Sequence, residues 1–312
     1  MRYEVGNMEL ELVQDWAKLP NGWEFKDVCG IATDEEDNVY VLNRSDHPVI
    51  VMTPDGECMG SWGEGYFSRA HGARRALDGS LFCTDDFANV VGKFSLKGEL
   101  LMQLGVKHEA SDTGWRPAWD SWQALGTIER SGPPFNRPTG VAEGPDGDIY
   151  VSDGYGNARI HRFDSSGHLK HSWGDPGGHP GQFRLPHDIA VDSRGRVLVA
   201  DRENSRIQLF DLDGNYLDQW NESLLRPMSL SFDKDGNVYV AELAMRVSVL
   251  SPDGELMGRW GNADEDKASA LFHGPHAIAI DSHEDVYVGD VALTHCGFDR
   301  GSNTIRKFKR VG

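Results

Sequence analysis

The sequence of 312 residues predicts an all-β fold, a six-bladed β-propeller. Two observations predict it. A motif of four short apolar runs, separated by hairpin turns, recurs six times, and the first residues of the chain read as the one strand that the last copy lacks. The later copies recur at about forty to fifty residues, which is the spacing of four-stranded blades. We therefore expect residues 1–312 to form a single propeller domain.

Each copy begins with a short apolar run. The six first runs are 28–32, 70–74, 138–142, 186–190, 227–231 and 275–279. A turn rich in Asp, Gly or Asn leads to a second run, such as 38–42, 148–152, 237–241 and 285–289. A third run follows, as in 159–163 and 206–210, then a turn of the Pro-Asp-Gly type and a fourth run that ends in Trp-Gly or its equivalent. Such turns join antiparallel strands, so each copy predicts one four-stranded blade.

The two ends of the chain are expected to share a blade. Residues 8–16 (MELELVQDW) read as a fourth strand, whereas the sixth copy stops after its third strand at Lys309. Because an open sheet edge invites aggregation, we expect the N-terminal strand to complete the last blade. Two insertions interrupt the repeat, at about 106–134, with Trp115, Trp119 and Trp122, and at 291–302.

Composition excludes several classes of partner. The net charge of −18, from 31 basic and 49 acidic residues, disfavours binding to nucleic acid or an anionic membrane. No run approaches the roughly eighteen apolar residues of a membrane span, and the first residues lack a signal peptide's features. The chain has four cysteines, Cys29, Cys58, Cys83 and Cys296. They form no CxxC motif, which suits a protein in a reducing compartment. We expect a cytoplasmic protein with a small-molecule substrate and leave its oligomeric state open.

One face of the predicted propeller collects the irregular loops. In a four-stranded meander, the start of the first strand and the loop between strands two and three lie on the same face, and most of the tight Asp-Gly turns lie on the other. The first face therefore holds both insertions and the loops 43–46, 85–87, 153–157 and 201–204. Long, chemically diverse loops on a rigid scaffold usually mark the functional face.

Three histidines occupy one repeated position on this face. His71, His187 and His276 stand second in the first runs of copies two, four and six, where the other copies have Cys29, Thr139 and Met228. A closed ring would place the three imidazoles around its axis. Three neutral imidazoles that leave a coordination position open are typical of catalytic zinc. The alternation therefore predicts a divalent metal, with zinc first and another transition metal as the alternative. The remaining histidines, among them His161, are expected to be ordinary polar residues.

The loops on this face resemble a known family. The matching strings are FNRPTGVA at 135–142, VSDGYGNARI at 151–160, Pro186-His187, VADRENSRIQ at 199–208, Pro275-His276 with VYVGD at 286–290, and Asn43-Arg44. They resemble the peptidyl-α-hydroxyglycine α-amidating lyases, six-bladed enzymes within the broader NHL-repeat class. These motifs cover about a third of the chain, and the blade pattern covers nearly all of it.

The resemblance implies specific roles. It implies that His71, His187 and His276 hold a catalytic zinc, that Tyr155 acts as base, that Arg44 contributes to catalysis and that Arg206 lies near the substrate. The family's reaction splits R-CO-NH-CH(OH)-COOH into an amide and glyoxylate. The chain also departs from the family. Ala277 replaces an aspartate associated with a structural calcium, so calcium is not expected, and Gly156 replaces a disulfide-forming cysteine. His71 lacks the usual preceding proline.

The same chemistry follows from the residue types. Collapse of a carbinolamide removes the hydroxyl proton while the departing nitrogen gains one, and a tyrosinate can take that proton beside cationic neighbours. An arginine fork fits a carboxylate, which points to Arg202 and Arg206 as substrate-binding residues. The alternative for Tyr155 is a packed aromatic residue, and for Arg44, Arg202 and Arg206 it is ion pairing.

The leading hypothesis is therefore a metal-dependent carbon-nitrogen lyase. It would cleave a small N-substituted α-hydroxyglycine or related carbinolamide to an amide or amine and a glyoxylate-like 2-oxoacid. Two other hypotheses stay open at this point, a lactonase-like metal-dependent hydrolase on the same propeller and a noncatalytic NHL-repeat scaffold. The sequence also leaves open whether Cys296 and His295, in the second insertion, take part.

Overall fold

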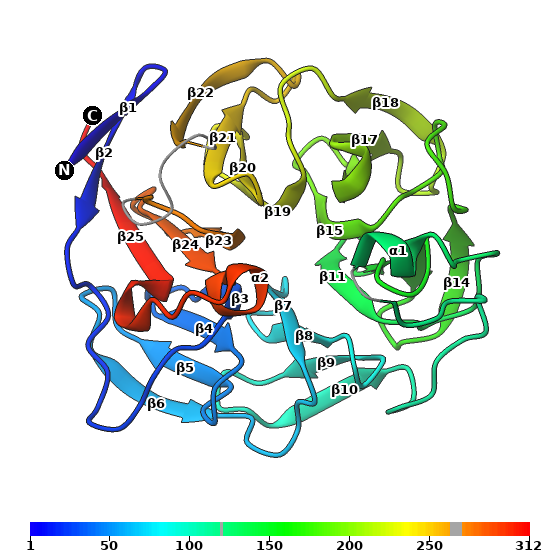
Figure 1. The fold of residues 1–312 in the computed structure, drawn as a ribbon, viewed down its shortest axis with the longest axis horizontal. Coiled ribbons are helices and arrows are strands. Elements are labelled where there is room, and N and C mark those ends of the chain that lie inside the picture. Colours follow the sequence, from blue (N-terminus) through cyan, green and yellow to red (C-terminus); the bar gives the residue numbers. More distant parts are fainter. Residues whose placement is uncertain (119–120, 263–269) are drawn as a thin grey trace. The chain divides into compact units, whose positions relative to one another are not determined.

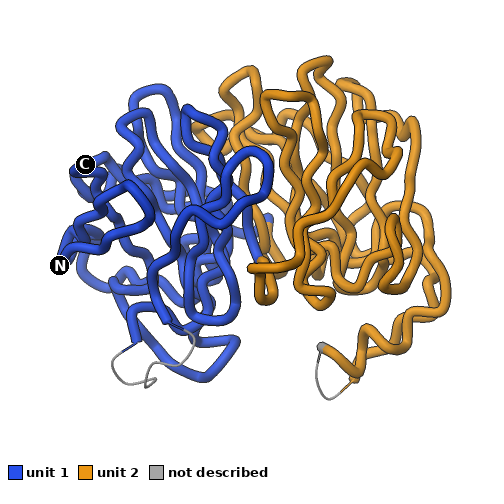
Figure 2. The backbone as a smooth tube through the Cα atoms, turned by 90° about the horizontal axis from the view of Figure 1, so that it is seen from above, with its two compact units in different colours: residues 1–66, 228–312 blue, residues 67–227 orange. Residues whose placement is uncertain are grey.

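The computed structural model describes residues 1–118, 121–262 and 270–312. The fold class is the predicted six-bladed β-propeller, built almost entirely from antiparallel sheets (Figure 1). The chain forms two compact units, shown in different colours in Figure 2: unit 1 holds residues 1–66 and 228–312, and unit 2 holds residues 67–227. Each unit contributes three of the six sheets.

Unit 2 contains three four-stranded sheets, each a meander of consecutive strands. Their strands are β7 (Ala70–Arg75), β8 (Leu81–Asp85), β9 (Val90–Phe94) and β10 (Leu100–Leu104); β11 (Pro138–Glu143), β12 (Ile149–Asp153), β13 (Arg159–Phe163) and β14 (Leu169–Trp173); and β15 (Pro186–Val191), β16 (Val197–Asp201), β17 (Arg206–Phe210) and β18 (Tyr216–Trp220). The last two sheets pack on each other through a buried cluster that includes Tyr150, Ile160, Ile189 and Phe210.

Unit 1 contains two further meanders. Their strands are β3 (Val28–Thr33), β4 (Val39–Asn43), β5 (Val49–Met52) and β6 (Cys58–Trp62); and β19 (Pro227–Phe232), β20 (Val238–Glu242), β21 (Arg246–Leu250) and β22 (Leu256–Gly261). The third sheet of unit 1 runs in the order β1-β2-β25-β24-β23 and joins both ends of the chain. Its strands are β1 (Arg2–Val5), β2 (Met8–Val13), β23 (Pro275–Ile280), β24 (Val286–Asp290) and β25 (Ile305–Arg310).

The shared sheet confirms that the N-terminus completes the last blade. Strand β2 pairs antiparallel with β25, with Leu10 opposite Arg310 and Leu12 opposite Phe308. The expected strand at residues 8–16 is shorter than its apolar pattern, since β2 ends at Val13. A fifth strand, β1, pairs with β2 and was not expected from the sequence. It covers the edge of β2 that would otherwise be open to pairing with another chain.

Burial falls from the inner strands to the outer ones. The second strand of each four-stranded meander is buried along its length, as in β8, β12 and β16. In the fourth strands β10, β14 and β18 only the last residue is buried, and most of the others are exposed. Several fourth strands end in a buried tryptophan, as expected from the Trp-Gly pattern: Trp62, Trp173, Trp220 and Trp260. The core therefore lies between neighbouring sheets, and the outer strands meet solvent.

A β-bulge follows the first residue of the inner strand in five sheets. The register between the first and second strands shifts at one residue in each of these sheets. The bulge residues are Cys29, His71, Thr139, His187 and His276. A bulge changes the direction in which a side chain points. The repeated position therefore has the same distinct backbone geometry in these five sheets, whichever residue occupies it.

Both insertions carry short helices. The first contains α1 (Ser121–Leu125), and the second contains α2 (Ala292–Cys296) and η2 (Gly301–Thr304); η1 (Arg202–Asn204) follows β16. Among the residues that the model describes, no helix has the length and apolar character that crossing a membrane would need. All four cysteines are free thiols.

Candidate active site

Two of the predicted histidine ligands meet in unit 2. His71 on β7 and His187 on β15 are almost fully buried, with 1% and 2% of their surface exposed. Their ring centroids are 4.8 Å apart, and they offer ring nitrogens within 4.8 Å of each other. Each is the bulge residue of its strand. Two strands whose starts are 116 residues apart in the sequence (70 to 186) thus present equivalent imidazoles to one place.

The Nδ1 atom of His71 has a defined partner. It lies 2.8 Å from the carbonyl oxygen of Thr139, the bulge residue of the next sheet. Because a carbonyl oxygen only accepts, Nδ1 carries the proton and Nε2 keeps its lone pair. Metal-bound histidines usually donate their second ring nitrogen in this way. The protein therefore holds His71 in the tautomer that a metal ligand needs.

His276 repeats this arrangement in unit 1. It is the bulge residue of β23, 4% exposed, and its Nδ1 lies 3.0 Å from the carbonyl oxygen of Cys29, the bulge residue of β3. The acceptor is again the equivalent position of another sheet. By the same reasoning, Nε2 of His276 carries the lone pair. In both units, therefore, the ring of a predicted ligand, His71 or His276, is oriented by the carbonyl of an equivalent bulge residue.

Tyr155 lies against the two histidines of unit 2. Its hydroxyl is 3.3 Å from Nε2 of His71 and 3.2 Å from Nε2 of His187. The residue follows β12 in the SDGY loop, where its backbone N–H donates to the carbonyl of Arg137. The phenol oxygen therefore lies within hydrogen-bond distance of Nε2 of both histidines that the sequence predicted as metal ligands in this unit.

Three guanidinium groups surround the ring of Tyr155. The Cζ atoms of Arg137, Arg202 and Arg69 lie 5.0, 5.6 and 5.8 Å from its centroid. Arg202 also places Nη1 3.5 Å from the phenol oxygen. Positive charge at this range stabilises negative charge that develops nearby during a reaction. Of the three, the sequence predicted only Arg202.

Arg202 is held from the side opposite its contact with Tyr155. Its Nε and Nη2 both lie 2.8 Å from Oε1 of Glu203, which Arg226 also contacts at 2.7 Å. The charges of Arg202 and Arg226 keep the pKa of Glu203 below its ordinary value although burial opposes this. The buried carboxylate thus stays ionised and fixes the direction of the Arg202 fork.

Arg206 takes a different part. Its guanidinium donates to Asp201 at 2.8 Å and Gln219 at 2.8 Å, and to the carbonyls of Gly178, His179 and Gln182. The side chain is 4% exposed. A substrate carboxylate would have to displace one of these bonds. The structure therefore shows Arg206 holding the 177–182 loop, and its predicted contact with substrate remains a prediction.

Arg44 lies in unit 1. Its Nη1 is 3.3 Å from Oδ2 of Asp27 and 3.3 Å from Oγ1 of Thr294 on α2. Ion pairing of this kind was the alternative expected for Arg44. The contact with Thr294 shows that the second insertion packs against the loop that carries this arginine. In the same helix, His295 stands beside Gly274, and Cys296 donates to the carbonyl of Ala292 at 3.2 Å.

The first insertion is tied to the loop that bears Tyr155. Thr113 Oγ1 donates to the carbonyl of Gly156 at 2.6 Å, and the N–H of Gly132 donates to Asn157 Oδ1 at 3.2 Å. Trp115 lies 5.2 Å from the guanidinium of Arg137. Trp119 lies outside the described residues. These contacts brace the Tyr155 loop from its outer side.

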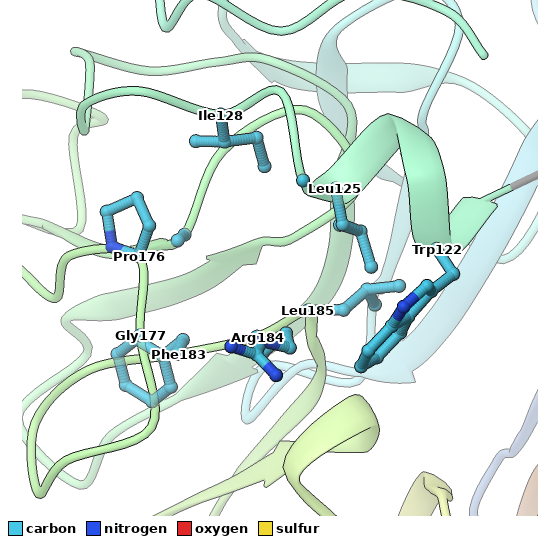
Figure 3. Close-up of a pocket in the computed structure, with 10 residues that line it drawn as sticks. Trp122, Leu125, Ile128, Pro176, Gly177, Phe183, Arg184 and Leu185 are labelled. Carbon is cyan, nitrogen blue, oxygen red and sulfur yellow. The ribbon is translucent and has the colours of Figure 1, made fainter.

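A cavity of about 370 Å³ lies between this insertion and the loop before β15. Trp122 and Leu125 of α1 face Arg184 and Leu185 across it (Figure 3). The guanidinium of Arg184 is 5.3 Å from the ring of Trp122. The carbonyl of Leu185, two residues before His187, accepts the N–H of Arg202 at 3.0 Å. Arg184 and Leu185, which line this cavity, therefore lie immediately before the strand that carries the predicted ligand His187.

The NHL-repeat model matches residues 135–163 and 183–210, which are blades of unit 2. NHL repeat-containing protein 3 of Homo sapiens is 31% identical over 252 residues, covering 76% of this chain and 68% of that protein. The chain belongs to the NHL-repeat family. The histidines and Tyr155 are therefore features built on an NHL-repeat propeller.

Amidating enzymes are among the relatives of this NHL-repeat protein. Peptidyl-glycine alpha-amidating monooxygenase B of Xenopus laevis is 27% identical over 326 residues, covering 92% of this chain but only 35% of that protein. A probable peptidyl-alpha-hydroxyglycine alpha-amidating lyase of Caenorhabditis elegans is 28% identical over 192 residues, covering 60% of this chain and 49% of that protein. The chain thus spans about a third of the frog protein. These matches support the resemblance to the amidating lyases that the SDGY and DREN loops indicated.

Solved structures share the fold along most of the NHL-repeat chain. Virginiamycin B lyase from Staphylococcus aureus superposes with a TM-score of 0.60 at 16% identity, covering 97% of this chain and 99% of that one. A gluconolactonase from Xanthomonas campestris gives a TM-score of 0.63 at 13% identity, covering 98% and 91%. At these identities the likeness concerns the fold alone.

Proposed function

We propose that this protein is a metal-dependent carbon-nitrogen lyase. It would split a small N-substituted α-hydroxyglycine, or a related carbinolamide, into an amide and a glyoxylate-like 2-oxoacid. One observation carries the proposal: the phenol oxygen of Tyr155 touches Nε2 of both His71 and His187, with the guanidinium of Arg202 beside it. The groups that we propose as proton acceptor, metal ligands and carboxylate binder thus lie within contact of one another.

The donor set fits a divalent transition metal. We propose that Nε2 of His71, His187 and His276 bind it together, because the Nδ1 atoms of His71 and His276 are both held by backbone carbonyls. Three neutral imidazoles are the ligand set of catalytic zinc, which leaves a position open to substrate. When bound, the ion supplies positive charge that stabilises negative charge developing on substrate oxygens. Calcium, which prefers oxygen ligands, does not suit three imidazoles.

Tyr155 is proposed to move the proton. As phenolate, it takes the hydroxyl proton of the carbinolamide; the carbon-oxygen bond becomes a carbonyl and the carbon-nitrogen bond breaks. The electron pair leaves on the amide nitrogen, which then takes the proton back from the Tyr155 hydroxyl. One proton is lost from oxygen and gained by nitrogen, so the atoms balance. Positive charge from the three guanidinium groups around the ring would stabilise negative charge that develops on oxygen in this sequence.

Arg202 is proposed to orient the substrate. Glu203 holds the Nε and Nη2 side of its fork, while Nη1 points to the Tyr155 oxygen. A carboxylate bound to this group would bring the adjacent hydroxyl near the phenol oxygen. Holding reacting groups in such geometry removes much of the entropic barrier to the reaction.

The direct test combines elemental analysis with product detection. Untagged protein should contain about one divalent transition metal per chain and should release glyoxylate from an N-acyl-α-hydroxyglycine. Chelation should stop the release, and added zinc should restore it. Protein without stoichiometric metal that still released glyoxylate would contradict the metal dependence, and metal-loaded protein that released none from any such substrate would contradict the lyase.

A metal-dependent hydrolase is the second candidate, because the same histidines could activate a water molecule. The two reactions differ in their products, since only the lyase forms a new carbonyl compound. Assaying lactone opening beside glyoxylate release on the same preparation separates them. A noncatalytic scaffold, the third hypothesis, would keep its affinity for a protein partner after chelation.

A further inference from the structure

Two arginines beside the ring of Tyr155 share one buried carboxylate in unit 2. Nη1 of Arg69 lies 2.8 Å from Oδ2 of Asp86, and Nη2 and Nε of Arg137 lie 2.5 and 3.2 Å from the same oxygen. The side chain of Asp86 is fully buried, whereas those of Arg69 and Arg137 are 19% and 17% exposed. We call Arg69, Asp86 and Arg137 the arginine pair site. One carboxylate fixes two guanidinium groups that remain open to solvent.

Aromatic rings hold both guanidinium groups in place. The Cζ atom of Arg137 lies 4.9 Å from the centroid of Phe87, 5.2 Å from that of Trp115 and 5.0 Å from that of Tyr155. Arg69 lies 4.9 Å from Phe87. Stacking of this kind orders a guanidinium without using its N–H groups. The arginine pair site is thus preorganised and adjoins the proposed proton acceptor.

The site keeps unused hydrogen-bond donors. Asp86 accepts from Nη1 of Arg69 and from Nε and Nη2 of Arg137. Within the part of the chain that the model describes, Nε and Nη2 of Arg69 and Nη1 of Arg137 have no hydrogen-bond partner. Such donors, on guanidinium groups that are partly exposed and held by aromatic rings, match the oxygens of a carboxylate.

The local charge also favours an anion. Two arginines face one aspartate, which leaves a net charge of one positive unit in a chain whose overall charge is −18. The carboxylate of Asp85 is engaged with backbone instead of the two guanidinium groups, since it accepts N–H groups from Ser68, Arg69, Phe87 and Ala88. An acidic protein that concentrates positive charge at one place attracts an anionic ligand there.

We propose that Arg69 and Arg137 bind a second carboxylate of the substrate, carried by the N-linked substituent. This inference rests on the proposed lyase function, in which Arg202 takes the carboxylate at the reacting carbon. It narrows the substrate from any small carbinolamide to one with acidic groups on both sides of the scissile bond. A neutral peptide chain would leave the arginine pair site without an anion.

The test compares two substrate analogues that cannot react. N-(para-carboxybenzoyl)glycine and N-(para-carbamoylbenzoyl)glycine lack the hydroxyl and differ only in one terminal group, acidic or neutral. Titration calorimetry on the metal-loaded protein should show that the acid binds about tenfold more tightly. Arg69→Gln and Arg137→Gln should each reduce this preference to within about threefold. The matched control Arg116→Gln alters an exposed arginine of the first insertion and should leave the preference unchanged.

Each outcome separates the two proposals. Equal affinities for the two analogues in the unaltered protein, or a preference that survives both substitutions, would overturn the arginine pair site. Glyoxylate release from the corresponding α-hydroxyglycines is measured separately. A preference for the acid without any glyoxylate would leave the site standing and remove the lyase. Each single variant leaves Asp86 one arginine, and thermal melting checks folding; should Arg137→Gln fail to fold, Arg69→Gln carries the test.

Discussion

Within each unit, a blade that places histidine at the bulge and the blade that supplies a carbonyl to that histidine differ in what they contribute. In unit 2, His71 supplies an imidazole, and Thr139 supplies the carbonyl that holds its Nδ1 at 2.8 Å. In unit 1, His276 and Cys29 stand in the same relation at 3.0 Å. In each pair, one blade carries a histidine proposed as a metal ligand, and the other blade supplies the carbonyl that orients its ring. The alternation in the sequence has a structural reason beyond threefold spacing.

The neighbouring blade can use its side chain for other contacts, because only its backbone orients the histidine. Thr139 Oγ1 lies 2.7 Å from the carbonyl of Pro186, the residue before His187, and 2.9 Å from Ser152 Oγ. Thr139 thus supports one histidine through its carbonyl and steadies the strand start of the next through its hydroxyl. Substituting partners of metal ligands typically weakens metal affinity by about 10–100-fold, which is less than the effect of losing a ligand.

Removing a proposed metal ligand should have the largest effect on metal binding. His187→Ala should lower metal content from about one ion per chain to below about a tenth, because two imidazoles seldom retain zinc at neutral pH. Elemental analysis after dialysis measures this. His161→Gln, which alters a buried histidine away from the bulge positions, serves as the control and should keep its metal. Full metal content in His187→Ala would show that the ion is held elsewhere.

Removing the proton acceptor should separate chemistry from metal binding. Tyr155→Phe keeps the ring on which the arginines stack but loses the hydroxyl beside Nε2 of His71 and His187. We expect kcat for glyoxylate release to fall by about 10²–10⁴-fold while metal content stays unchanged. Steady-state kinetics on metal-loaded protein measure it. A variant that retains a tenth or more of the activity would assign the proton transfer to another group.

A histidine whose two ring nitrogens both have protein partners should contribute to stability and not to metal binding. His161 on β13 contacts Ser172 Oγ at 2.8 Å and Asp153 Oδ2 at 3.3 Å. His161→Gln should lower the free energy of unfolding by about 1–3 kcal/mol at neutral pH, because buried partners lose good hydrogen bonds. Urea denaturation of the apoprotein measures this. A variant as stable as the unaltered protein would show that these contacts contribute nothing net.

The pH dependence of that difference follows from burial. Burial lowers the pKa of His161 below its ordinary value of 6.5. In the folded protein the ring stays neutral where the unfolded chain already binds a proton, so stability is lost as pH falls through about 6.5. The gap between the protein and His161→Gln should therefore narrow from about pH 7.5 to about pH 5.5. A gap that widens on acidification would mean that the buried imidazole is charged.

The hydroxyl of the neighbouring blade should have the smallest effect. Thr139→Val removes the bonds to Pro186 and Ser152 but keeps the backbone carbonyl that holds His71. We expect metal affinity to weaken by less than about tenfold, at the lower end for residues outside the ligand set. Competition with a metal-binding dye measures it. Loss of binding as complete as in His187→Ala would show that the side chain, and not the carbonyl, orients the ligands.

The repeat pattern was sufficient to predict the blades and the closing strand. Apolar runs and turn residues reflect interactions over a few positions, so they can be read from the sequence. The pairing of β2 with β25 was predicted in this way. Strand β1 was missed because no copy of the repeat contains a fifth strand. The histidines were found because they share one register position, and Tyr155 and Arg202 because they lie in recognisable loops.

The arginine pair site could not be found in this way. Arg69, Asp86 and Arg137 belong to different repeats or to different positions of a repeat, and no spacing relates them. Arg206 shows the opposite case, since its motif suggested substrate binding while the fold engages its donors with the 177–182 loop.

By itself, the sequence determined the number of blades, the strand that joins the two ends of the chain and the recurring histidine position, because these depend on local periodicity. Tertiary structure alone decided which carbonyl orients each histidine, which arginines surround Tyr155 and which of them keep donors for a ligand. Those outcomes depend on side chains from separate blades meeting in space, and their energies arise only after the sheets have packed.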